Sequence, residues 1–196
     1  MIKSQKLAAC LATACAVLAQ PVLAEQAYPV RPIKIVIGFA PGGSTDTPMR
    51  VLAESVSKIL KQPVVIENRP GAGGTLPAVV MQSSSNDGYT FGVASAGVYR
   101  LPYTTDLKWD PAKDLTYIIG LTGYAFGIVV PSSSPIQTWS DYIAAAKAKP
   151  GELTYGTPGM ATTQHLTMEQ ISRRAGIKLN HVPYKGTGET MLALTA

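Results

Sequence analysis

Hydrophobic positions along this chain follow two periods in turn, and their alternation predicts an α/β fold. Short runs rich in apolar, β-branched or aromatic residues over 33–39, 63–67 and 89–95 are typical of strands. After the first run, apolar residues recur from Met49 to Leu60 at the spacing of one helical stripe. Because strands that alternate with helices usually form parallel sheets, we expect an open parallel sheet.

The same alternation continues through the second half of the chain. Thr138 and Asp141 match a capping box, with Asp in place of Glu, and predict a helix that ends near Lys149. Residues 100–112 have no clear period and contain two prolines, so we expect a surface crossover there. The apolar residues 126–130 mark the expected passage to a second lobe. We also expect strands over 115–121, 153–156 and 179–183, and helices over 75–85, up to 175 and from 188 onwards.

One pattern occurs three times: a strand, a turn rich in Gly, Ser and Thr, and then a helix. The turns centre on residues 41–46, 156–163 and 184–188. In an open parallel sheet such turns lie at the carboxyl ends of the strands, where ligands bind. Each turn presents backbone N–H groups and the positive end of a helix, and both favour an anion. Helix capping explains any one of these turns by itself, but three of them together predict an anion site.

The first 24 residues have the pattern of a secretory signal peptide. Lys3 and Lys6 precede an apolar run over 7–19 that is too short to span a bilayer, and small residues end at Ala24. An N-terminal anchor helix and lipidation are the alternatives. Both cysteines lie in this segment, so the exported chain would have no disulfide and no thiolate nucleophile. We therefore expect a periplasmic protein whose mature chain begins near Glu25.

The charge of the chain changes this picture little. Its formal net charge is +5, and Lys and Arg are scattered without any basic run. This distribution argues against nucleic acid as a partner. A mild positive balance does suit an anionic solute.

Nucleotide-binding, catalytic and metal-binding patterns fit the chain poorly. Gly38 and Gly43 have the spacing of a Walker A loop, but Ser44 stands where that loop has its Lys. No serine lies in the G-x-S-x-G frame of a hydrolase nucleophile. The two histidines, His165 and His181, have no acidic cluster beside them. We therefore predict a protein that is not an enzyme and that has no cofactor and no metal site.

What remains is recognition of a carboxylate by backbone amides and hydroxyls, whose charge-assisted hydrogen bonds are strong. Asp46 would repel a carboxylate, so we expect it to cap the helix together with Ser44, Thr45 and Thr47, or to accept from a ligand hydroxyl or water. For His165 a ligand contact and a packing role stay equally open. The donors expected to face the anion are Gly42, Gly43, Ser44, Thr45, Thr157, Gly159, Thr162 and Thr163.

Six motifs, taken together and in order, resemble a known family. They are Tyr28-Pro-Val-Arg-Pro-Ile33, Gly38-Phe-Ala-Pro-Gly-Gly-Ser-Thr-Asp46, Pro63-Val-Val-Ile-Glu-Asn-Arg-Pro-Gly-Ala-Gly-Gly74, Asp87-Gly-Tyr-Thr90, Ala146-Lys-Ala-Lys-Pro-Gly151 and His181-Val-Pro-Tyr-Lys-Gly186. The set is similar to that of the Bug/TctC family, the periplasmic solute receptors of tripartite tricarboxylate transporters.

This resemblance implies a periplasmic binding protein fold of type II, the two-lobed Venus flytrap. Residues 25–124 would form lobe 1, and residues 125–196 would form an incomplete lobe 2, because family members are longer. A monomeric receptor would capture a di-, tri- or aromatic carboxylate between the lobes and deliver it to membrane subunits of a transporter. The open alternative is an exported sensor subunit that docks on the ectodomain of a histidine kinase.

The resemblance also implies a set of binding residues. The loop 41–46 would hold the carboxylate through amides and waters, and the loops 157–165 and 184–185 would meet it from the second lobe. Four further residues could favour an aromatic acid or pack elsewhere, namely Tyr99, Tyr103, Tyr124 and Met160. The full expected set is Phe39, Pro41, Gly42, Gly43, Ser44, Thr45, Asp46, Ser95, Ala96, Thr157, Gly159, Thr162, Thr163, His165, Tyr184 and Lys185.

Overall fold

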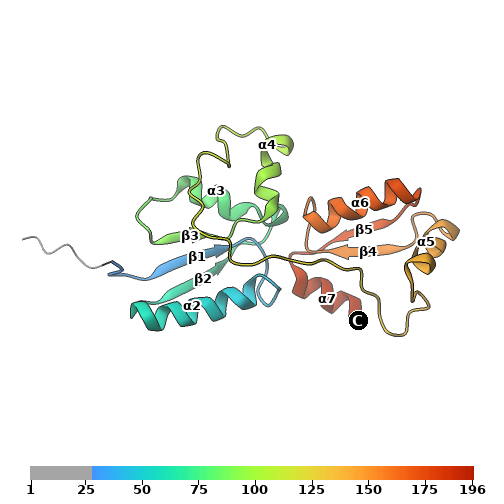
Figure 1. Cartoon of the computed structure of the whole chain (residues 1–196), viewed down its shortest axis with the longest axis horizontal. Helices are drawn as coiled ribbons and strands as arrows, with labels where there is room; N and C mark the ends of the chain where they lie inside the picture. Colours follow the sequence, from blue (N-terminus) through green and yellow to red (C-terminus); the bar gives the residue numbers. More distant parts are fainter. Residues whose placement is uncertain (1–27) are drawn as a thin grey trace, which may run out of the picture. The chain divides into compact units, whose positions relative to one another are not determined.

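The computed structural model describes residues 28–196, so the expected signal peptide lies outside the described residues. The chain divides into two units, Met1–Val30 and Arg31–Ala196. The second unit contains every helix and strand discussed below (Figure 1). No helix in the described part of the chain is long and apolar enough to cross a membrane.

The first sheet is parallel and has the strand order β2-β1-β3. The central strand β1 (Ile33–Ile37) pairs with β2 (Val64–Asn68) on one side and β3 (Thr90–Gly92) on the other. Val36 and Ile37 are fully buried, as expected for the middle strand of a sheet covered on both faces. The predicted parallel sheet is therefore confirmed, although β3 is shorter than the apolar run that predicted it.

The predicted strand over 33–39 ends two residues early, at Ile37. The next residue, Gly38, lies against the loop after β2, where a Cβ would stand 2.5 Å from the carbonyl oxygen of Gly74. Only glycine fits such a close approach of two backbones. The chain leaves the sheet at this point and enters the first glycine-rich turn.

Two helices pack against this sheet. The helix α2 (Asp46–Leu60) contacts β2 and buries Met49 and Ala53, which confirms the first part of the predicted apolar stripe. Near the end of the helix the prediction is wrong for Ile59, which is 77% exposed. The helix α3 (Leu76–Ser83) follows the short 3₁₀ helix η1 (Ala72–Gly74) and contacts β1 and β3. Figure 1 shows α2 and α3 on opposite sides of the three strands.

The segment after β3 differs from the sequence prediction. The 3₁₀ helix η2 (Ala96–Arg100) and the short helix α4 (Leu101–Thr104) occupy the start of the expected crossover, and no helix or strand follows until α5 begins at Trp139. The predicted strand over 115–121 is wrong. A strand needs a partner for its backbone groups, and no described strand lies beside this segment, whose Ile118 and Ile119 are 70% and 73% exposed.

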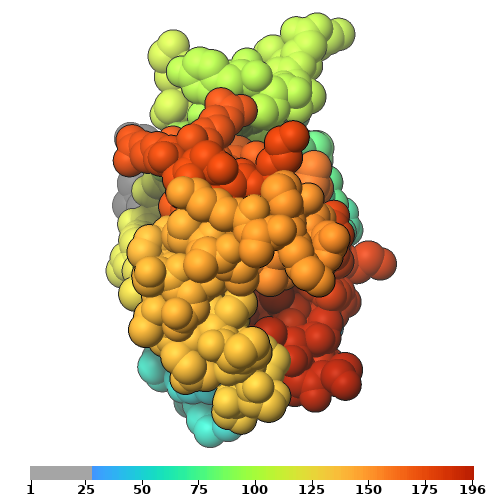
Figure 2. All heavy atoms as spheres, turned by 90° about the vertical axis from the view of Figure 1, so that its right-hand side faces the viewer, coloured from blue at the N-terminus to red at the C-terminus, as the bar shows by residue number. Residues whose placement is uncertain are grey.

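The second sheet has two parallel strands, β4 (Thr154–Thr157) and β5 (Asn180–Pro183), in the register that sets Gly156 opposite Val182. Its helices are α5 (Trp139–Ala148), α6 (Thr163–Ala175) and α7 (Thr187–Thr195). In Figure 2 the orange α5 faces the viewer, with α6 above it and the red α7 to the right.

The core of this region joins α5, α6 and the connection to β5. Tyr142 and Ala146 of α5 pack with Met168 of α6 and with Ile177, and all four are buried. The predicted capping box at the start of α5 is confirmed. The Asp141 N–H donates to the Thr138 hydroxyl at 3.2 Å, and the Thr138 N–H donates to the Asp141 carboxylate at 2.9 Å.

Candidate functional site

The three predicted turns meet beyond the carboxyl ends of the strands. The turn after β1 and the turn after β5 are joined by a backbone hydrogen bond of 2.8 Å, from the Ala40 N–H to the Lys185 carbonyl. The hydroxyls of Ser44 and Thr187 lie 3.1 Å apart at the same junction. The turn after β4 contributes Thr162 to the same pocket as Ser44 and Thr187, so all three turns supply one site.

Asp46 shapes the first turn rather than capping the helix that follows. Its carboxylate accepts from the Gly42 N–H at 2.8 Å, from both Nε and Nη2 of Arg50 at 2.8 and 3.0 Å, and from Asn68 Nδ2 at 2.8 Å. The N-cap position of α2 is Thr45, which makes no side-chain cap bond. The expected hydroxyl and carboxylate cap is therefore wrong, because the buried Asp46 faces back into its own loop.

The same contacts explain how a negative charge is kept close to an anion-binding turn. Burial alone would raise the pKa of Asp46, but the hydrogen bonds from Arg50, Gly42 and Asn68 together hold that pKa below its ordinary value. Asp46 is thus ionised and forms an ion pair with Arg50, and it does not line the pocket.

The backbone N–H groups of the first turn are left for a ligand. The N–H groups of Gly43, Ser44 and Thr45 donate to no protein acceptor in the described part of the chain. They lie at the N-terminus of α2, a helix of 15 residues, whose dipole adds positive potential. This combination favours a carboxylate at the turn.

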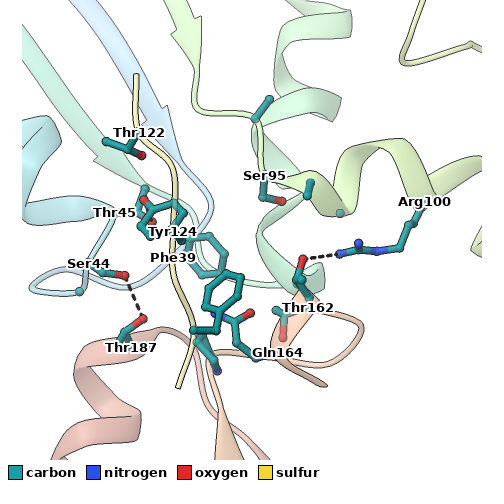
Figure 3. Close-up of a pocket in the computed structure, with 18 residues that line it drawn as sticks. Phe39, Ser44, Thr45, Ser95, Arg100, Thr122, Tyr124, Thr162, Gln164 and Thr187 are labelled. Atoms are coloured by element: carbon teal, nitrogen blue, oxygen red, sulfur yellow. Dashed lines mark hydrogen bonds between the residues drawn. The ribbon is translucent and has the colours of Figure 1, made fainter. Parts of the chain in front are cut away.

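The pocket has a volume of about 250 Å³, and Figure 3 shows the residues that line it. Hydroxyls and backbone groups form part of its wall, and Phe39, Tyr124 and Phe126 supply aromatic surface. Among the residues that the structure describes, Arg100 is the only charged one in the lining. The lining residues are Phe39, Gly43, Ser44, Thr45, Gly73, Ala94, Ser95, Ala96, Gly97, Arg100, Thr122, Tyr124, Phe126, Pro158, Thr162, Thr163, Gln164 and Thr187.

The structure brings together half of the residues expected from the sequence. Those that line the pocket are Phe39, Gly43, Ser44, Thr45, Ser95, Ala96, Thr162 and Thr163. A second cavity of about 190 Å³, which shares Phe39 with the first, is lined by Gly159, Tyr184 and Lys185. Neither cavity is lined by Pro41, Gly42, Asp46, Thr157 or His165.

Thr157 holds the second turn from inside. Its buried hydroxyl donates to the Gly159 carbonyl at 3.0 Å and lies 2.7 Å from His181 Nε2. Because the single hydroxyl proton is directed to Gly159, His181 Nε2 is the donor in the second contact. Burial, together with the neighbouring His165, lowers the pKa of His181, so its imidazole is neutral. Thr157 and His181 therefore fix the shape of the turn.

His165 occupies the packing position that the sequence left open. Its ring stacks on that of His181 with centroids 4.0 Å apart, and its Nδ1 accepts from the Ala161 N–H at 3.1 Å. Thr162 caps α6, because its hydroxyl accepts from the His165 N–H at 3.4 Å. In this structure His165 supports the turn after β4 and does not reach the pocket.

Several pocket residues were missed by sequence reasoning, and Tyr124 was named only as a residue that could contact an aromatic acid or pack elsewhere. Thr122, Tyr124 and Phe126 come from the segment without regular structure, where no period indicates which side chains point inward. Tyr124 reaches the first turn, and its hydroxyl lies 3.1 Å from that of Thr45. Arg100 was missed although it follows the predicted Ser95 and Ala96 by only four or five residues, because the 3₁₀ helix that turns it inward has no sequence signature.

Solved structures of similar proteins share this fold. MatC from Rhodopseudomonas palustris with bound malate is 27% identical, with a TM-score of 0.71, over 85% of this chain and 57% of that chain. A protein of R. palustris with adipate is 30% identical, with a TM-score of 0.67, over 85% of this chain and 56% of that chain. The expected α/β fold of periplasmic binding proteins is therefore confirmed.

Curated relatives are also similar to this chain, and a family model matches most of it. A UPF0065 protein in the gbd 5′ region of Cupriavidus necator is 60% identical over 85% of this chain and 51% of its own length. BugT of Bordetella pertussis is 34% identical over 90% of this chain and 55% of its own length. The chain thus spans about half the length of the curated relatives that it matches. Residues 49–196 match the tripartite tricarboxylate transporter family receptor, TctC, and the chain belongs to this family of solute-binding receptors.

Proposed function

We propose that this chain is an extracytoplasmic receptor that binds an organic carboxylate in the pocket between its two sheets and delivers it to the membrane subunits of a tripartite transporter. The observation that carries this proposal is the set of unpaired N–H groups at Gly43, Ser44 and Thr45, at the start of α2 and on the wall of the pocket. Such groups favour a carboxylate, since each can donate a charge-assisted hydrogen bond.

The similar solved structures support a carboxylate as the ligand. One of them holds malate and another holds adipate, and both are small organic acids. A pocket of about 250 Å³ suits a solute of that size better than a large one. The family described for residues 49–196 supports delivery to a transporter.

The proposal describes a binding protein rather than an enzyme. His165 and His181 stack on each other outside the pocket, and Thr157 is held by His181 and Gly159. No group of three or more His, Cys, Asp or Glu residues that could hold a metal ion occurs in the part of the chain that the structure describes. Recognition by amides and hydroxyls needs neither a metal nor a nucleophile.

A thermal melt of the purified chain with mono-, di-, tri- and aromatic carboxylates tests the proposal. A ligand at about a hundred times its Kd adds roughly 2.7 kcal/mol to the free energy of unfolding, which raises the Tm of a domain of this size by about 5–10 °C. If no carboxylate shifts the Tm and none is seen to bind by calorimetry, the proposal is wrong.

Gly43→Val makes the test specific to the first turn. A Cβ at Gly43 would lie 3.5 Å from the backbone nitrogens of Thr187 and Gly188. The methyl groups of a valine would therefore displace the first turn from the start of α7, and we expect the carboxylate-dependent rise in Tm to disappear. Gly120→Val is the matched control, because nothing lies within 4 Å of a Cβ at Gly120 and this residue does not line the pocket. Equal ligand shifts in the two variants would contradict the role given to the first turn.

A further inference from the structure

Arg100 has no counter-charge among residues 28–196, which the structure describes. It is the last residue of η2 and lines the pocket together with Ser95, which precedes that helix. None of the residues that line the pocket is Asp or Glu, and no carboxylate of the described residues forms an ion pair with Arg100. The pocket therefore carries a positive charge that the described chain does not neutralise.

The guanidinium of Arg100 is also short of hydrogen-bond acceptors. Its Nη2 donates to the Ala161 carbonyl at 3.2 Å and to the Thr163 hydroxyl at 3.4 Å, and both contacts are long. Its Nε is buried and has no partner. A buried donor without an acceptor is unfavourable. A guanidinium has five N–H donors, so the two long contacts leave donors of Arg100 that can bind a carboxylate.

The free N–H groups of the first turn and the guanidinium lie apart in the pocket. Figure 3 shows Ser44 and Thr45 on one side and Arg100 on the other, with the rings of Phe39 and Tyr124 between them. An acid that filled the pocket would meet an anion-binding group at each end and apolar surface in the middle. A short aliphatic chain with a carboxylate at each end has this pattern.

We propose that Arg100 binds the second carboxylate of a short aliphatic dicarboxylate whose first carboxylate is held by the turn after β1, and that Arg100 thereby selects diacids over monoacids. The inference rests on the function proposed above and names the class of solute. The competing explanation is that Arg100 only holds the turn after β4 in place through Ala161 and Thr163.

Calorimetric titration with adipate and hexanoate separates these explanations, because the two acids have the same chain length and differ in one carboxylate. We expect the unmodified chain to bind adipate at least about tenfold more tightly than hexanoate, as is typical for a charge-assisted hydrogen-bonded pair. Arg100→Gln should lose this preference and bind the two acids about equally. Arg173→Gln is the matched control, since it removes an exposed arginine from α6 outside the pocket lining and should keep the preference.

The outcomes distinguish failure of this inference from failure of the proposed function. If the unmodified chain binds both acids equally, or if Arg100→Gln keeps the preference for adipate, the role of Arg100 is overturned while the receptor function stands. If neither these two acids nor any other carboxylate binds, both proposals fail. Should Arg100→Gln unfold, Arg100→Met decides, because it keeps a long side chain without the charge: a folded variant that has lost the preference for adipate supports the inference, and one that keeps the preference overturns it.

Discussion

Asp46 is a buried anion beside a turn that we expect to bind anions, and its partners explain how both can be stable. The Gly42 N–H, Arg50 and Asn68 all donate to its carboxylate, so its charge is directed into the loop. By engaging Gly42, Asp46 also holds the turn in the shape that leaves the N–H of Gly43 free. A residue that would repel the ligand from the pocket wall thus positions the groups that attract it.

Replacing Asp46 with Asn should lower the free energy of unfolding by about 1–3 kcal/mol, because it removes charge-assisted hydrogen bonds from a buried group. The pKa of Asp46 in the folded chain lies below its ordinary value of 3.8, so the folded state binds this proton less tightly than the unfolded state. The stabilisation is therefore complete above about pH 4 and is lost as the pH falls through the folded-state pKa.

Urea denaturation of Asp46→Asn and the unmodified chain at pH 7 and at pH 3 measures both effects. The difference between the two chains should be large at pH 7 and should shrink at pH 3. Glu54→Gln is the control, because Glu54 also pairs with a cation four residues away, Lys58, but both are exposed. A difference for Asp46→Asn no larger than that for Glu54→Gln at pH 7 would contradict the assignment.

At the scale of elements, some helices begin and end at signals in their own sequence, whereas the long segment between α4 and α5 forms no helix or strand. The helix α5 belongs to the first kind, because both halves of its capping box lie within four residues of sequence. It also carries Tyr142 and Ala146 into the core that supports the second sheet. Its first turn should therefore be sensitive to loss of the cap.

Thr138→Ala removes the acceptor for the Asp141 N–H and should reduce the free energy of unfolding by about 1 kcal/mol, or the Tm by about 2–4 °C. Ser140 lies in the same helical turn, is exposed and takes no part in the capping box, so Ser140→Ala should change the Tm little. Differential scanning calorimetry of the two variants measures the difference. Equal changes in Tm would show that helix propensity, rather than the cap, sets the stability of this turn.

The same division explains which elements and site residues the sequence could predict. The strand–turn–helix units could be recognised because each lies in one continuous stretch of sequence. Within that stretch, the apolar period marks the strand and the helix, and the glycines mark the turn between them. The strand expected over 115–121 has the right composition, but pairing depends on a partner elsewhere in the chain, which local pattern does not report. Arg100 was missed, and the place of Tyr124 was left open, for a related reason: each side chain is held by a contact distant in sequence, with Ala161 and with Thr45 respectively.

At the scale of the whole molecule, the connection between the two sheets exposes an unusual amount of apolar surface. Ile118, Ile119 and Val129 are each more than half exposed, and every residue from 116 to 130 is exposed. Residues 115–121 are rich in residues of high β-propensity and contain no charge and no proline. Exposed segments of this composition are templates for pairing with another chain.

We therefore expect this chain to self-associate through residues 115–121 as its concentration rises. Ile119→Lys should reduce the rate of association, measured by light scattering at 37 °C, because a charge opposes pairing of identical segments. The Tm should change little, since Ile119 is already 73% exposed.

Tyr103→Lys is the matched control: Tyr103 is 88% exposed but lies in α4. If both variants slow association equally, added net charge is the cause; if neither does, the segment is not the site of association. Pairing through this segment is supported only if Ile119→Lys slows association and Tyr103→Lys does not. Residues 115–121 would then form a strand by pairing with the same segment of another chain, although they form none within one chain.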